Sequence, residues 1–64
     1  MEQLAFKYGE LVALRIYGRD AGLGVFLEAH VINDHEVVCE VYSQREARII
    51  QVFIHHLQRI RIPS

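Results

Sequence analysis

The sequence predicts a small, mainly β fold in which three antiparallel strands follow a short helix. Apolar and polar residues alternate from Val12 to Val41, so each extended segment has one apolar face. Polar breaks at residues 18–24 and 33–36 interrupt the alternation with Gly, Asn and Asp, which chain reversals favour. Residues 43–64 are rich in β-branched and apolar side chains, which suits two further strands.

The first part of the chain predicts a helix and then three strands. Residues 1–8 are expected to form the helix, because Leu4 and Tyr8 share one face and Gly9 is a typical stop. Two helical turns are marginal alone, so this helix is expected to pack on the sheet. The glycine-rich residues 18–24 are expected to form a mobile loop. The three strands are expected at about residues 10–17, 24–32 and 36–43.

The last third of the chain has a helical interpretation. Ser43 and Glu46 are spaced as a capping-box pair, and on a helical wheel most apolar residues from Ala47 to Ile60 gather on one side. The fold would then be αβββα, a three-stranded sheet that carries a C-terminal helix.

The same residues have a strand interpretation. Residues 44–47 would form a turn and residues 49–55 a strand rich in β-branched and aromatic side chains. A sharp bend at His56 and Leu57 would lead to a last alternating strand at residues 59–62. The local pattern leaves both interpretations open.

Composition limits the functions that this chain can have. Hydrophobic residues make up 52% of only 64 residues, more than one small core can bury, which predicts a homo-oligomer. The net charge of −1 provides no overall basic field, so a nucleic-acid site would have to be a local patch. No nucleophile with a base, phosphate-binding glycine motif or carboxylate pair has catalytic spacing, so we expect no enzyme and no cofactor.

The cysteine content and the apolar segments bear on location. The single Cys39 excludes an intrachain disulfide and is expected to be a buried small hydrophobic residue. The first residues lack the basic and apolar regions of a signal peptide, and no apolar stretch is long enough to cross a membrane. We therefore expect a cytoplasmic protein.

The spacing of the apolar residues, a glycine and a polar loop resembles the Sm-like family, which includes the bacterial Hfq proteins. The residues that carry this first resemblance are Val12, Leu14, Ile16, Gly24, Phe26, His30, Asp34 and Val37. Near the C-terminus, Ile54-His55-His56 and Ile62-Pro63-Ser64 resemble the Tyr-Lys-His and Val-Pro-Ser segments of Hfq. The resemblance implies a short N-terminal helix and a five-stranded antiparallel barrel of the SH3/Sm-like type. It also implies a ring in which strand four of one subunit pairs with strand five of the next.

The resemblance further implies binding of single-stranded RNA. His55 and His56 would line the pore of the ring and donate to uracil oxygens or phosphate. The other pore-facing loop would consist of His30, Asn33, Asp34 and His35, and Arg59 would meet phosphate. Ile32 stands where Hfq has its base-stacking aromatic residue, which puts the uridine pocket in doubt.

Two other hypotheses compete with RNA binding. The chain could be a homo-oligomeric assembly or protein-interaction module that binds no nucleic acid. A zinc site of His30, His35 and Cys39 is conceivable, but no His or Cys pair has zinc-finger spacing, so no metal is expected.

Overall fold

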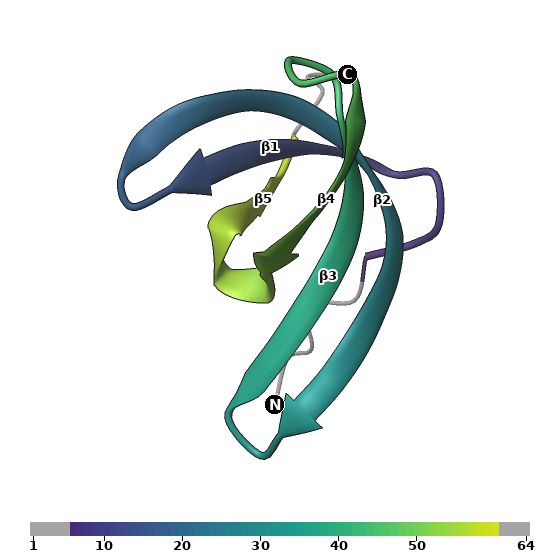
Figure 1. Ribbon diagram of the computed structural model, residues 1–64, viewed down its shortest axis with the longest axis vertical. Coiled ribbons are helices and arrows are strands. Elements are labelled where there is room, and N and C mark those ends of the chain that lie inside the picture. Colours follow the sequence, from purple (N-terminus) through teal and green to yellow (C-terminus); the bar gives the residue numbers. More distant parts are fainter. Residues whose placement is uncertain (1–5, 61–64) are drawn as a thin grey trace.

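The computed structural model describes residues 6–60, and these residues form one antiparallel sheet of five strands (Figure 1). The strand order across the sheet is β4-β3-β2-β1-β5. The elements are β1 (Leu11–Ile16), β2 (Arg19–Asn33), β3 (Glu36–Ser43), β4 (Arg48–Phe53), the 3₁₀ turn η1 (Ile54–His56) and β5 (Leu57–Arg59).

Strands adjacent in sequence are also adjacent in the sheet until the chain reaches η1. After η1, β5 pairs with β1 on the opposite side of the sheet from β4, with Leu57 opposite Leu14. Consequently β4 and β5 are the two outer strands of the sheet, and the short turn η1 joins them.

The sheet is strongly bent, and Gly24 in β2 permits the close approach that this bend requires. A Cβ atom at Gly24 would lie 2.6 Å from Cγ1 of Val41 and 2.9 Å from the carbonyl oxygen of Tyr42. The register of β2 against its neighbours shifts at three points, typical of bulges that increase local bending. A residue without a side chain is therefore required where β2 bends over β3.

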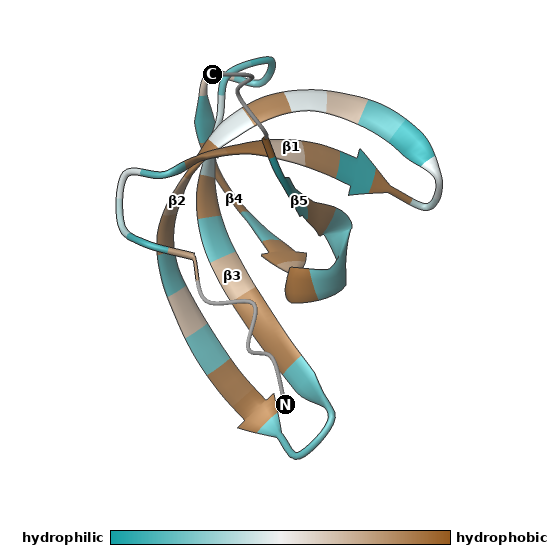
Figure 2. Cartoon of the chain, turned by 180° about the vertical axis from the view of Figure 1, so that it is seen from behind, coloured by the Kyte–Doolittle hydropathy of each residue, from teal (hydrophilic) through white to brown (hydrophobic). Residues whose placement is uncertain are grey.

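The core lies where side chains from all five strands meet. Phe6 extends this core, because its ring centroid lies 5.6 Å from that of Phe26. Hydrophilic residues interrupt hydrophobic runs along β2 and β3 (Figure 2). The period of two appears in burial, since every second residue from Cys39 to Ser43 in β3 is buried. Cys39 is fully buried, and burial raises the pKa of its thiol. The buried hydrophobic residues are Val12, Leu14, Phe26, Cys39, Val41, Val52 and Leu57.

The prediction of a mobile loop at residues 18–24 is wrong. β2 already begins at Arg19, and the turn consists of Tyr17 and Gly18, with φ angles of 53° and 76°. Two left-handed residues in succession are typical of the tight hairpin turn that matches strand twist. The other two glycines of this segment lie inside the strand, Gly22 at a register shift and Gly24 at the close approach described above.

The strand interpretation of the last third is confirmed, and the αβββα alternative is wrong. The expected link between Ser43 and Glu46 does form, since the Glu46 amide donates to Ser43 Oγ at 3.1 Å. It closes a turn rather than opening a helix, because Ala47 adopts a left-handed φ of 58° and directs the chain into β4. The bend comes earlier than expected, at η1 rather than at residues 56–57, and β5 begins at Leu57 rather than at residue 59. Residues 61 and 62 of the predicted last strand lie outside the described residues.

The N-terminal helix predicted at residues 1–8 lies largely outside the described residues. From Phe6 onward the chain forms a turn, in which the Glu10 amide donates to the Lys7 carbonyl at 2.9 Å. The Lys7 amide in turn donates to Glu10 Oε1 at 3.0 Å. Within residues 6–60 no helix is long and apolar enough to cross a lipid bilayer.

Candidate functional site

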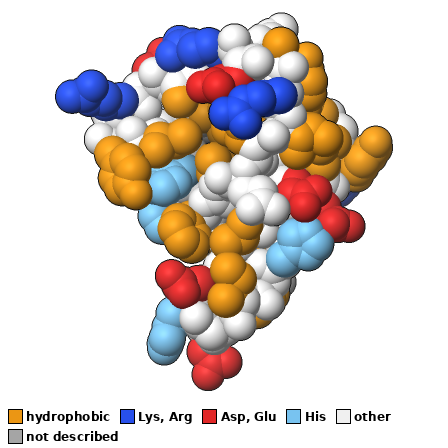
Figure 3. Space-filling model, viewed as in Figure 1, with side chains coloured by type: hydrophobic (Ala, Val, Ile, Leu, Met, Phe, Trp, Pro, Cys, Tyr) orange, Lys and Arg blue, Asp and Glu red, His pale blue; other side chains and the backbone are white. Residues whose placement is uncertain are grey.

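Two surface hollows lie side by side where β1 ends and η1 begins, and both are lined by Tyr17 and His56. The first, of about 380 Å³, is largely apolar, with Ile16, Val38 and Phe53 in its wall. In the space-filling view, histidine side chains lie among hydrophobic ones on the visible face (Figure 3). The second hollow, of about 340 Å³, is more polar than the first and is lined by Arg15, Tyr17, Gly18, His55, His56 and Gln58.

Four rings form a continuous cluster around these hollows. The Phe53 ring is stacked on His55, with centroids 5.7 Å apart and planes inclined by 7°. His55 meets His56 edge-on at 4.3 Å, and His56 meets Tyr17 edge-on at 5.5 Å. The 3₁₀ turn brings Phe53, His55 and His56 together within one turn of chain, and the β1–β2 hairpin supplies Tyr17.

The two histidines differ in environment. His55 is exposed, whereas only 9% of His56 is accessible to solvent. Burial lowers the pKa of His56, and the neighbouring charge of His55 lowers it further. His56 is thus held toward its neutral form, in which one ring nitrogen donates and the other accepts a hydrogen bond.

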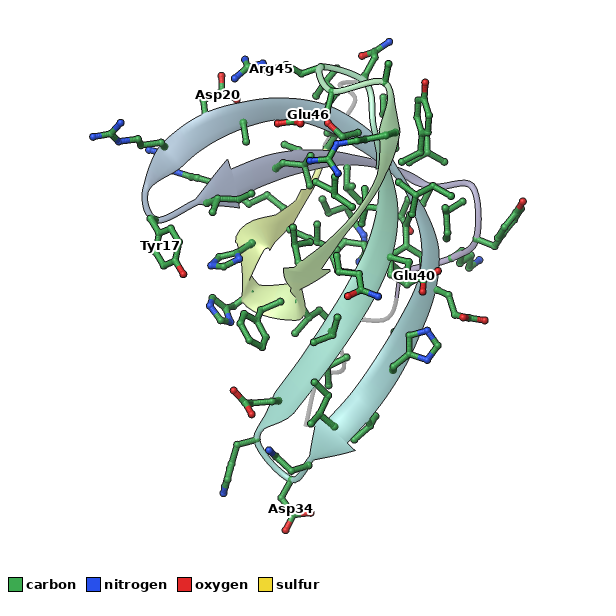
Figure 4. The ribbon with its side chains drawn as sticks, viewed as in Figure 1. Tyr17, Asp20, Asp34, Glu40, Arg45 and Glu46 are labelled. Carbon is green, nitrogen blue, oxygen red and sulfur yellow. The ribbon has the colours of Figure 1, made fainter. Side chains whose placement is uncertain are left out.

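Tyr17 is a functional candidate that the sequence analysis missed. Its side chain is 86% exposed although it belongs to a ring cluster, and its backbone is left-handed, which is uncommon for a residue with a bulky side chain. Figure 4 shows Tyr17 projecting from the β1–β2 turn beside η1. A signal for this turn was present in the sequence. Tyr17-Gly18 lies between two alternating segments, as the two residues of a tight hairpin turn do.

His30, expected beside the other histidines, belongs to a different cluster. Its Nε2 lies 2.8 Å from Glu28 Oε2 and 3.7 Å from Glu40 Oε2. Glu40 and Tyr17 lie on opposite sides of the molecule in Figure 4. Glu28 and Glu40 are cross-strand partners on β2 and β3, so His30 contacts two carboxylates that lie side by side.

The three residues of the zinc hypothesis do not lie together. His30 and His35 are exposed, whereas Cys39 is buried in the core, so these three residues do not form a common site. Among residues 6–60, one carboxylate oxygen from each of Glu28 and Glu40 and one nitrogen of His30 lie within 4.8 Å of one another. The ion pairs described above account for this grouping.

Asn33 and Asp34 lie at the tip of the β2–β3 hairpin, away from η1 (Figure 4). The Asn33 side chain stabilises the turn, because Oδ1 accepts from the His35 amide at 2.8 Å and Nδ2 donates to Glu36 Oε1 at 2.9 Å. In a single chain these residues do not meet His55 and His56.

Arg59 lies against the N-terminal turn. Its Nε donates to Glu10 Oε2 at 2.8 Å, and its guanidinium carbon lies 4.8 Å from the centre of the Phe6 ring. The pKa of Glu10 is lowered, first by the hydrogen bond from the Lys7 amide and then by the hydrogen bond from Arg59. Among the predicted RNA-binding residues, His55 and His56 lie together at η1, Asn33 and Asp34 lie at the β2–β3 turn, and His30 and Arg59 lie elsewhere on the sheet.

No similar protein is found. Comparisons with family models, curated proteins and solved structures give no match to this chain. The resemblance to the Sm-like family therefore rests on the residues of this sequence alone.

Proposed function

We propose that the protein forms a homo-oligomeric ring of Sm-like type and binds single-stranded RNA at η1. The observation that carries this proposal is that η1, with His55 and His56, joins the two outer strands of the sheet. Pairing of β4 with β5 of a neighbouring subunit would place an η1 turn close to every subunit interface.

Ring closure is supported by the unpaired edges of the sheet. An outer strand presents free amide and carbonyl groups that favour pairing with another chain. Contacts between unlike edges, β4 with β5, are heterologous and form a ring when the rotation between subunits closes. A closed ring leaves neither edge exposed.

RNA binding is supported by the chemistry of the η1 cluster. Imidazoles can donate to base oxygens or phosphate, and rings near a surface hollow can stack on unpaired bases. The cluster contains the aromatic residues Phe53 and Tyr17, so base stacking does not depend on position 32.

The assembly is tested by measuring the mass of the particle in solution. Sedimentation equilibrium is expected to give a closed oligomer of several chains. The variant Ile49→Lys places a charge on the exposed side of β4, one of the two strands proposed to pair between subunits, and should dissociate the oligomer. A wild-type protein that is a single chain at micromolar concentration would contradict the ring.

RNA binding is tested by fluorescence anisotropy with labelled oligo(U) and oligo(A). Affinity should weaken steeply with salt. It should fall roughly tenfold in His55→Ala, the change expected when a base or phosphate loses one or two hydrogen bonds. Gln44→Ala is the control, because Gln44 is exposed in the β3–β4 turn and lines neither hollow.

A second candidate is an assembly module without nucleic-acid binding. It is favoured by an apolar row across four strands, in which Leu11, Val25, Tyr42 and Ile49 are successive cross-strand partners. Three of these four residues, all except Val25, are exposed. An intact oligomer that binds neither oligonucleotide at low salt would favour this candidate over RNA binding.

A further inference from the structure

We infer that Tyr17 and Phe53 hold one unpaired nucleobase, and that Arg15 and His55 contact the phosphate next to it. This inference rests on the proposed RNA binding and assigns the stacking residue to the β1–β2 turn.

The division of the surface into two hollows carries the inference. Tyr17 and His56 line both hollows, so a mainly apolar hollow and a more polar one adjoin at these residues. A nucleotide has the same division, since its base is flat and largely apolar on both faces while its phosphate is charged. Volumes of about 380 and 340 Å³ are at the small end of ligand sites, which suits one nucleotide better than a folded partner.

The apolar hollow is suited to a base. Ile16, Val38 and Phe53 provide apolar wall, and the exposed Tyr17 ring stands at its margin. Gln51, also in the wall, carries an amide that can donate to and accept from the edge of a base.

The more polar hollow is suited to a phosphate. Arg15 is exposed, and within residues 6–60 its guanidinium makes no ion pair, although Asp20 is its cross-strand partner. His55 lies in the same hollow and is exposed. A guanidinium beside a donor imidazole matches phosphate geometry.

The conformation of Tyr17 supports a role outside folding. Left-handed backbone is costly for a residue with a Cβ atom, and Asn or Gly would suit this turn better. The Tyr17 ring also adds nothing to the buried core. Strain and exposure at one position are typical of residues held for binding.

A proline-rich peptide is the principal alternative ligand, because such peptides bind aromatic grooves. The guanidinium of Arg15 and the imidazole of His55 in the second hollow favour an anionic ligand. A proline-rich segment carries no phosphate. We therefore assign the site to a nucleotide.

The experiment compares binding of labelled oligo(U), oligo(A) and an abasic oligomer of equal length by anisotropy at low salt. The variant is Tyr17→Asn, which removes the ring and suits the left-handed turn, so that folding is preserved. Tyr17→Phe keeps the ring. Tyr8→Ala is the control, because Tyr8 is also highly exposed, at 80%, and lines neither hollow.

The expected result is a loss of affinity for oligo(U) or oligo(A) of about 5- to 100-fold in Tyr17→Asn, the range of one base stack. Tyr17→Phe and Tyr8→Ala should bind as the wild type does. The abasic oligomer should bind weakly and equally to wild type and Tyr17→Asn.

Other results overturn the inference in distinguishable ways. Wild-type affinity in Tyr17→Asn, with a loss in His55→Ala, removes Tyr17 from the site and leaves the RNA-binding proposal in place. An equal loss for the abasic oligomer shows that Tyr17 does not stack on a base. Failure of wild type to bind any oligonucleotide, or binding of a proline-rich peptide alone, overturns both proposals.

Discussion

The His56 ring lies edge-on against the Tyr17 ring, with centroids 5.5 Å apart, and this contact joins two distant turns of the chain. Tyr17 belongs to the hairpin between β1 and β2, and His56 ends the turn between β4 and β5. The pairing of β5 with β1, with Leu57 opposite Leu14, brings the two turns together. The candidate site thus depends on a long-range strand pairing.

Gly24→Ala should destabilise the fold by about 1–3 kcal/mol, the usual cost of overpacking. The added Cβ would lie 2.6 Å from Val41 Cγ1 and 2.9 Å from the Tyr42 carbonyl oxygen, and the latter belongs to backbone that cannot easily move. Urea denaturation at fixed protein concentration measures the loss. Gly18→Asn is the control and should change stability little, because a side chain there meets nothing within 4 Å and Asn tolerates left-handed backbone. Equal stability of Gly24→Ala and wild type would contradict the close approach of β2 to β3.

Ala47→Gly should raise the free energy of unfolding by about 0.5–1 kcal/mol, because glycine adopts left-handed backbone without steric cost. Ala47 has a φ of 58° in the turn between β3 and β4. Thermal and urea denaturation check the sign of the effect. The comparison is Ala29→Gly, at an exposed alanine inside β2, which should lower stability by about the same amount. Destabilisation by both substitutions would exclude the left-handed turn.

Stability should decrease as the pH falls through about 6.5, the ordinary pKa of histidine. Burial and His55 hold the pKa of His56 below that value in the folded state, so the unfolded chain binds more protons in this range. Protonation then favours unfolding, and the decrease should level off below the folded-state pKa of His56. Urea denaturation between about pH 7.5 and 5.5 measures this dependence. In His56→Gln this contribution should disappear, and an unchanged pH dependence in that variant would show that His56 is not its source.

The Cys39 thiol should react with iodoacetamide at least about tenfold more slowly in the native protein than in denaturant, because burial restricts access and disfavours the thiolate. Cys39 is fully buried, and the pKa of its thiol is raised by that burial. Mass spectrometry of timed samples gives the two rates. Labelling at the same rate in both conditions would place Cys39 outside the core.

The alternation between Val12 and Val41 was sufficient to predict three strands, because side chains on a strand repeat every two residues regardless of the rest of the fold. The buried role of Cys39 followed from the same pattern and is confirmed. The glycines were harder to interpret. Residues 18–24 resemble a loop in composition, yet two of their glycines serve a bulge and a close approach inside β2.

The last third of the chain shows where local pattern is insufficient. The spacing of Ser43 and Glu46 suits either a helix cap or a tight turn, and the same hydrogen bond occurs in both. The outcome depends on whether the following residues can pair with β3, as Val52 does opposite Cys39. Pairing between distant segments is a tertiary interaction that no local period encodes.

The sequence by itself determined the two-residue period of burial in β1 and β3, where Leu14 and Val41 are buried, since strand periodicity depends only on backbone geometry. It did not determine the buried face of β2, in which Phe26 is buried and Val31 is exposed. Tertiary structure alone decided that His30 pairs with Glu28 and Glu40, whereas His56 meets Tyr17. The physical reason is that the site depends on strand order and register. These are determined by the sum of contacts across the sheet and the bend at Gly24, and neither is a property of one segment.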